Sequence, residues 1–117
     1  MGLLSTSLRL NWKLDMSDRV EFLHDDAPDF MIEETRFMAE FGEVRVVCRI
    51  DRSGWYMKFG SNKSGPRGRA AVFEKNRTLI ERAAERKILA GDFDSKSWDA
   101  DPATWSILLT GEDLKGA

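Results

Sequence analysis

Residues 69–90 read RAAVFEKNRTLIERAAERKILA, and this stretch decides the fold that we expect for the chain of 117 residues. Its apolar residues recur at the three- and four-residue steps of an α-helix, and only Asn76 and Lys87 interrupt them. The face that these steps define consists of Val72, Phe73, Asn76, Leu79, Ile80, Ala83, Ala84, Lys87 and Ile88. The opposite face is charged, so the stretch predicts one long amphipathic helix that packs on a β-sheet.

The segments on either side of this main helix are typical of its boundaries. Residues 60–68, GSNKSGPRG, cannot bury apolar surface and predict a flexible basic loop before the helix. Arg86 and Lys87 suit the negative pole of the helix, and Gly91 is the residue expected just after a C-cap. The helix is therefore expected to start at residue 69 and to end near residue 90.

The clearest strand signal lies at residues 43–50, where Val44, Val46, Cys48 and Ile50 share one face and alternate with Arg45, Val47 and Arg49. Residues 31–41 form the preceding strand, although Glu33, Glu34, Met38 and Ala39 could equally belong to a helical turn. Gly42 stands between the two runs and predicts a hairpin turn. One face of the expected sheet is therefore buried, and its reverse is mostly wet.

Weaker patterns complete the sheet. Residues 8–14 alternate and predict an N-terminal strand within an extension over residues 1–18, and residues 19–23 predict a second strand that pairs with it. Residues 51–54 read as a turn, 55–59 as a strand and 105–110 as the last strand, while 92–104 form an acidic loop with Phe93 and Trp98 as anchors. Residues 111–117 are expected to fray. The fold class is therefore α+β, with residues 1–117 as a single compact domain and a mostly antiparallel sheet.

Composition argues against a disulfide-stabilised protein and against a membrane-spanning one. The single cysteine cannot form a disulfide framework, and no apolar run approaches the roughly 18 residues that a membrane span needs. We therefore expect a cytoplasmic protein with no membrane partner.

No catalytic site, metal site or cofactor is predicted. His24 with Asp25 and Asp26 has the residue types of an acid/base or metal site, but one histidine cannot supply the usual zinc ligand set. Cys48 is either a nucleophile or, on an inward strand face, an inert small hydrophobe. The acidic loop lacks the order of a calcium-binding loop, so a solvated loop is the better interpretation.

Charge is distributed unevenly along the chain. Residues 52–90 carry ten Lys and Arg against three Asp and Glu, whereas both flanks are acidic. Either these are solvated or mutually attracting faces, or the middle third is a positive surface that meets an anion. In the second case the anion-binding or nucleic-acid-binding candidates are Lys58, Lys63, Arg67, Arg69, Lys75 and Arg77, with Trp55 and Tyr56 as aromatic contacts.

Three functions follow as hypotheses. The first is a small non-enzymatic interaction protein that binds a partner protein or a second copy of itself through a sheet edge or a Trp-bearing surface. The second is a nucleic-acid-binding module that uses the basic region 58–77. The third is an enzyme of unknown class, for which a cleft joining His24, Cys48 and loop acids is the required observation.

The order of elements resembles a small bacterial family of uncharacterised proteins, domain of unknown function 1488. The resemblance rests on the run GEVRVVCRI at residues 42–50, on Phe73, Asn76, Arg77, Ile80, Glu81 and Ala84 in the helix, and on the acidic end at Asp113. It covers roughly residues 19–114. It implies a compact α+β domain in which Cys48 is the strand cysteine, and it implies no known activity.

Overall fold

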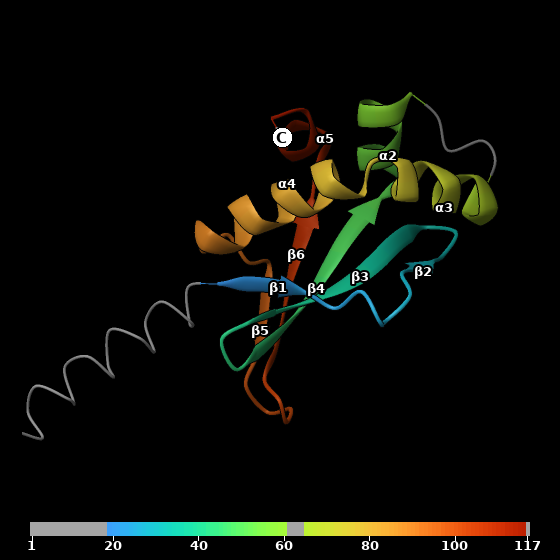
Figure 1. The fold of residues 1–117 in the computed structure, drawn as a ribbon. Helices are drawn as coiled ribbons and strands as arrows, with labels where there is room; N and C mark the ends of the chain where they lie inside the picture. Colours follow the sequence, from blue (N-terminus) through green and yellow to red (C-terminus); the bar gives the residue numbers. More distant parts are fainter. Residues whose placement is uncertain (1–18, 61–64, 117) are drawn as a thin grey trace, which may run out of the picture.

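The computed structural model describes residues 19–60 and 65–116 (Figure 1). The strand expected at residues 8–14, and with it the whole extension over residues 1–18, lies outside the described residues.

A six-stranded sheet forms one layer of the molecule. Its strands are β1 (Val20–Phe22), β2 (Asp29–Phe30), β3 (Glu34–Phe41), β4 (Val44–Asp51), β5 (Ser95–Ser97) and β6 (Thr104–Leu109). The spatial order is β1-β3-β4-β6-β5, with β2 pairing beside β3, and every pairing is antiparallel except the parallel one between β4 and β6. The expected α+β class and mostly antiparallel sheet are confirmed. The short strand expected at residues 19–23 is present as β1, which pairs with β3.

The β3–β4 hairpin is the centre of the sheet and matches the prediction. Gly42 has φ 64°, a conformation that glycine adopts at little cost, and it turns the chain between the two strands. Val46, Cys48 and Ile50 of β4 are fully buried, whereas Arg45 and Arg49 point to the other face and are only partly covered. The hydrophobic alternation therefore predicted both the strand and which of its side chains face the core.

The helix predicted at 69–90 is two helices. α3 (Gly65–Lys75) and α4 (Arg77–Leu89) meet at Asn76, whose φ −116° and ψ 19° are not helical. The side-chain amide of Asn76 donates to the carbonyl of Val72 at 2.9 Å, a local bond that competes with helix geometry. The expected face is still the buried one, because Phe73, Ile80, Ala83, Ala84 and Ile88 all lie in the core.

The start of this helical region was also misplaced. α3 begins at Gly65, so the predicted loop over residues 60–68 extends too far and its last residues are helical. The physical reason is that a proline such as Pro66 is well tolerated in a first helical turn. The other end is as expected, with Gly91 just beyond α4 at φ 75°.

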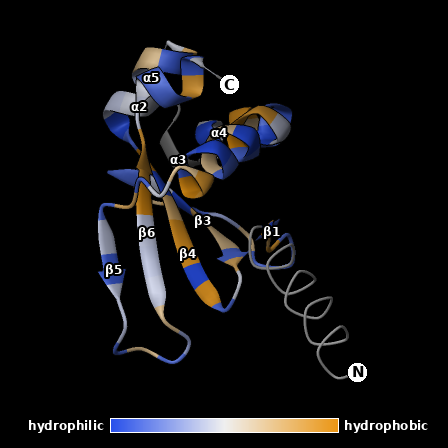
Figure 2. Cartoon of the chain, turned by 90° about the vertical axis from the view of Figure 1, so that its left-hand side faces the viewer, coloured by the Kyte–Doolittle hydropathy of each residue, from blue (hydrophilic) through white to orange (hydrophobic). Residues whose placement is uncertain are grey.

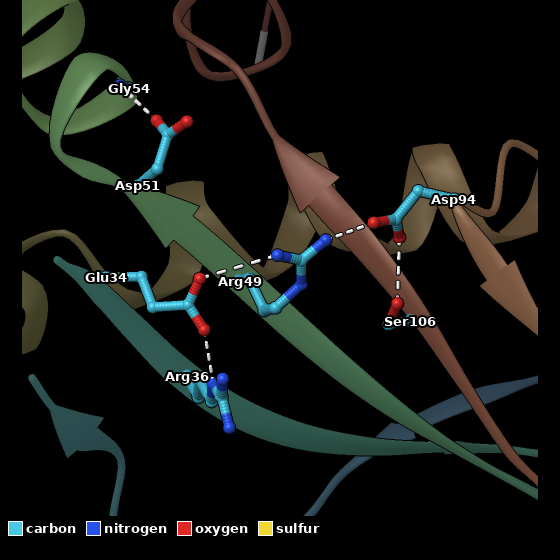
Figure 3. Close-up of polar contacts among 7 residues, drawn as sticks. All are labelled: Glu34, Arg36, Arg49, Asp51, Gly54, Asp94 and Ser106. Carbon is cyan, nitrogen blue, oxygen red and sulfur yellow. Dashed lines mark hydrogen bonds and ion pairs between the residues drawn. The ribbon is translucent and has the colours of Figure 1, made fainter.

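Residues 51–59 form a helix rather than the predicted turn and strand. α2 (Arg52–Phe59) begins after Asp51, whose carboxylate accepts a hydrogen bond from the Gly54 amide at 2.8 Å (Figure 3). This N-cap explains the error, because Asp and Ser favour turns and helix starts equally well. Trp55 is fully buried, and its indole Nε1 donates to Thr35 Oγ1 at 3.0 Å.

The C-terminal residues, expected to fray, form α5 (Gly111–Lys115). Thr110 and Asp113 make a capping box, and Lys87 of α4 donates to Asp113 at 2.6 Å and to the Leu108 carbonyl at 2.8 Å. A Cβ on Gly111 would lie 2.5 Å from the Cβ of Met57, so this glycine allows α5 to pack closely on α2. Reciprocal capping and these tertiary bonds order a segment whose composition indicated a tail.

The helices lie on one side of the sheet and at one end of it. Figures 1 and 2 show α3 and α4 along one side of the sheet, with α2 and α5 side by side near the ends of β4 and β6. The loops at the opposite end of the sheet, between β3 and β4 and between β5 and β6, extend away from the helices (Figure 1).

Candidate functional site

An open groove of about 740 Å³ lies at the loop end of the sheet, and we call it the sheet-end groove. Its lining comes from the β3–β4 turn and from the segment that joins β5 to β6. The apolar part of this lining consists of Phe41, Val44, Trp98, Pro102, Ala103 and Trp105. The backbone amide of Arg45 donates to the Ala103 carbonyl at 2.8 Å, which ties the two walls together.

Trp105 is the centre of the aromatic wall. The rings of Phe93 and Trp98 each meet the Trp105 ring edge-on, with centroids 4.8 Å apart, and the ammonium of Lys96 lies 4.5 Å from the Trp105 centroid. The two anchors expected in the acidic loop, Phe93 and Trp98, therefore both pack on a strand residue. Trp98 nevertheless remains 66% exposed, so much of its ring is available to a partner.

Two carboxylates, Glu43 and Asp101, complete the sheet-end groove. The described residues that line it include no lysine or arginine. Because the ammonium of Lys96 already lies over the Trp105 ring, the attraction for a further cation comes from these two carboxylates. The groove is therefore suited to an apolar segment that carries a positive charge.

The cations predicted as one anion-binding set differ in their burial and in their partners. Lys58 is half-buried on α2 and Lys75 is exposed at the end of α3, while Lys63 and the side chain of Arg67 lie outside the described residues.

Arg77 is occupied by neighbours on its own helical region. Its guanidinium forms ion pairs with Glu74 and Glu81 and lies 5.0 Å from the centroid of the Phe73 ring. The hydrogen bond to Glu74 is the main cause that raises the pKa of Arg77, and its charge is balanced within the fold.

Arg69 is buried, only 3% exposed, between α3 and the segment that joins β2 to β3. Its Nη2 donates to the Ile32 carbonyl at 3.0 Å, while Nε and Nη1 have no hydrogen-bond partner among the described residues. Burial lowers the pKa of Arg69, the positive charge of Arg52 lowers it further, and the carboxylate of Glu33 raises it.

The two predicted aromatic contacts are separated by their position on α2. Trp55 is enclosed in the core, whereas Tyr56 is 65% exposed. The expectation that both present stacking surfaces is therefore wrong for Trp55, because residues 55–59 form a helix that turns this side chain inward.

His24 and Cys48 do not form a reactive pair. His24 lies 2.7 Å from Glu81 at the surface, whereas Cys48 is fully buried, and burial raises the pKa of its thiol far above the usual value with a further contribution from Glu81. A thiol in that setting stays protonated and packs as a small hydrophobe.

The face of the sheet opposite the helices carries a paired network rather than free charge. Arg49 of β4 lies between Glu34 and Asp94, Ser106 donates to Asp94 at 2.8 Å, and Glu34 also pairs with Arg36 (Figure 3). Its charges neutralise one another, so this network ties neighbouring strands together.

Within residues 19–60 and 65–116, no group of His, Cys, Asp and Glu side chains is arranged to hold a metal ion. None of the helices in the same ranges combines the length and the apolar character that crossing a membrane requires.

Sequence reasoning missed the sheet-end groove. Its signal was present in the sequence as two tryptophans and a proline within residues 98–105. Only the antiparallel pairing of β5 with β6, and the parallel pairing of β6 with β4, places these residues beside the β3–β4 turn.

The chain was compared with known proteins. A family model described as "Protein of unknown function (DUF1488)" matches residues 24–98. The comparison with curated proteins and the comparison with solved structures found no match. The matched region runs from the loop after β1 to Trp98 and contains both the β3–β4 hairpin and helices α2 to α4. The chain therefore belongs to the DUF1488 family of proteins of unknown function.

Proposed function

We propose that this protein is a small non-enzymatic binding protein whose sheet-end groove receives a segment of a partner protein. The observation that carries the proposal is the groove itself, an open hollow with aromatic walls and two carboxylates. Mostly apolar concave surfaces with a few placed polar groups are the usual form of binding sites. Trp98, the most exposed of the aromatic side chains that line it, is of the residue type that dominates binding energy at protein interfaces.

The chemistry of the groove identifies the kind of segment that fits it. Phe41, Trp98 and Trp105 offer apolar and aromatic contact, and Glu43 and Asp101 attract a cation. The matching partner segment carries a lysine or arginine between apolar side chains. Its cation lies against the carboxylates and its apolar residues against the tryptophans.

The test is selection of binders from a displayed random-peptide library on the full chain, followed by fluorescence anisotropy of the enriched peptides. We expect enrichment of peptides that combine basic and apolar residues. Trp98→Ser is expected to weaken their binding by about tenfold or more, the effect of losing an interface hot spot. Asp101→Lys is expected to weaken it as well, because the reversed charge repels the peptide cation.

Matched controls come from the same chain. Tyr56 is as exposed as Trp98 but lies on α2, so Tyr56→Ser leaves peptide binding unchanged, and Asp26→Lys in an exposed loop controls for the change in net charge. Enriched peptides that lack basic residues, or whose binding ignores both Trp98→Ser and Asp101→Lys, would overturn the proposal. A dimer that Trp98→Ser dissociates would replace the separate partner by a second copy of the chain.

Nucleic-acid binding through the region 58–77 is the second candidate. Lys58 and Lys75 are exposed or half-buried and have no ion pair among the described residues, which favours it. The burial of Arg69 and the pairing of Arg77 count against one continuous basic surface. Affinity for single-stranded DNA that falls steeply with salt supports this second function, and a flat salt dependence opposes it.

A further inference from the structure

Arg69 is a buried cation whose hydrogen-bonding capacity is mostly unused. A guanidinium has five N–H donors, and here only the bond from Nη2 to the Ile32 carbonyl is present among the described residues. Buried polar groups in folded proteins nearly always have partners, and a buried charge requires an opposite charge. The Nε and Nη1 donors of Arg69 are therefore available to bind an anion.

A second guanidinium lies nearby at the surface. The Arg52 side chain, at the start of α2, is 58% exposed and forms a loose ion pair with Glu33 at 3.7 Å, and the Glu33 side chain is 77% exposed. Arg52 and Glu33 both act electrostatically on Arg69. The two arginines also bind neighbouring residues of the segment between β2 and β3, because Arg69 donates to the Ile32 carbonyl and the Arg52 backbone amide donates to the Glu33 carbonyl at 3.2 Å. Among the described residues, the ion pair with Glu33 is formed by Arg52 alone.

We infer that Arg69 and Arg52 bind a phosphate group at the junction of α2, α3 and the segment between β2 and β3. A dianionic phosphate balances both guanidinium groups, and its oxygens match the paired N–H donors of arginine. Glu33 competes for the same charges and holds Arg52 when phosphate is absent. This phosphate site is separate from the sheet-end groove and does not depend on it.

The test follows the arginine Nε–H signals of the full chain by ¹H–¹⁵N NMR during titration with inorganic phosphate, with chloride keeping the ionic strength constant. The Arg69 signal, assigned through Arg69→Lys, is expected to shift and to saturate. Arg52→Gln is expected to weaken the affinity by about tenfold, the loss of one charge-assisted contact. Glu33→Gln is expected to tighten it, because the competing carboxylate is removed.

Arg36→Gln is the matched control, since Arg36 is an exposed arginine that pairs with Glu34 in β3. Its phosphate affinity should equal that of the unchanged chain. Titration with oligothymidine distinguishes the source of the phosphate: saturation at lower phosphate concentration than with the inorganic ion assigns the site to a nucleic-acid backbone. A shift that grows linearly without saturation, or equal affinities in Arg52→Gln and Glu33→Gln, would overturn the inference. Both variants change exposed side chains, and their affinities can be compared on any arginine Nε–H signal that saturates, so this comparison does not require Arg69→Lys to fold.

Discussion

Thr35 and Trp55 form a fully buried hydrogen bond that joins β3 to α2. The indole is otherwise surrounded by apolar residues, so the hydroxyl of Thr35 is what makes a tryptophan acceptable at this position. The pair also explains why residues 51–59 are helical. A strand would place alternate residues of 55–59 on one face, whereas the helix turns Trp55 inward and leaves Tyr56 in solvent.

Thr35→Val tests the contribution of this hydrogen bond. Valine has nearly the same shape, but it leaves the indole N–H buried without a partner, so we expect the free energy of unfolding to fall by about 1–3 kcal/mol. Urea denaturation followed by tryptophan fluorescence measures it. Thr78→Val on the exposed surface of α4 is the control, and its effect should stay within about 0.5 kcal/mol. Equal stabilities of Thr35→Val and the unchanged chain would show that the bond contributes nothing.

At the scale of elements, capping residues and tertiary hydrogen bonds decided where the helices begin and end, which the composition did not determine. Asp51 begins α2, Asn76 divides the long helical region into α3 and α4, and Thr110 with Asp113 begins α5. Each of these residues also favours turns, so its role depends on the structure on either side of it. β3 and β4 were predicted more accurately than residues 55–59, because their alternation extends over eight residues.

The cap of α5 makes a pH-dependent contribution to stability. Burial alone would raise the pKa of Asp113, but hydrogen bonds from Lys87 and Thr110 hold it below the usual value. A depressed carboxyl pKa stabilises the fold above the unfolded-state value and loses that effect as the pH falls through the folded-state value. We therefore expect Asp113→Asn to lower stability by about 0.5–2 kcal/mol at pH 7, the size of a lost cap.

The same variant should differ less from the unchanged chain at low pH, because the carboxyl group is protonated first in the unfolded state and then, as the pH falls through its lower folded-state pKa, in the folded state. Urea denaturation at pH 7 and at pH 3 measures the two differences. Asp26→Asn, in the exposed loop before β2, serves as control and should show no such convergence. A difference that stays constant between the two pH values would argue that Asp113 acts without its charge.

At the scale of the whole molecule, β4 lies at the centre of the sheet. It pairs along its length with β3 and over six residues with β6, and its inward side chains are fully buried. β5 is a three-residue edge strand whose residues are all exposed. The helices cover only one face, so the stability of the molecule is concentrated in β3, β4, β6 and the helices packed on them.

Native-state hydrogen exchange tests this distribution. Amides of Val47 and Cys48 in β4 should exchange only through global unfolding, because strands flank β4 on both sides. Ser95 and Ser97 in β5 should open at a much lower free energy. If the β4 amides exchanged as readily as those of β5, stability would not be concentrated in the central strands.

The two candidate sites differ in how far the sequence predicted them. Arg69 was among the residues predicted from sequence as an anion site, although the reason given, a basic region before a helix, differs from the buried and underbonded guanidinium that the structure shows. The sheet-end groove was not predicted at all. Its walls come from residues 41–44 and 98–105, which are far apart in the chain.

By itself, the sequence determined the fold class, the β3–β4 hairpin, the buried face of the helical region and the family, because hydrophobic periodicity and local motifs are properties of neighbouring residues. Only the tertiary structure decided that residues 52–59 and 111–115 are helices, that Trp55 and Arg69 are buried, and that two loops enclose a groove. These outcomes depend on contacts between segments distant in sequence, and no local pattern contains the free energy of such contacts.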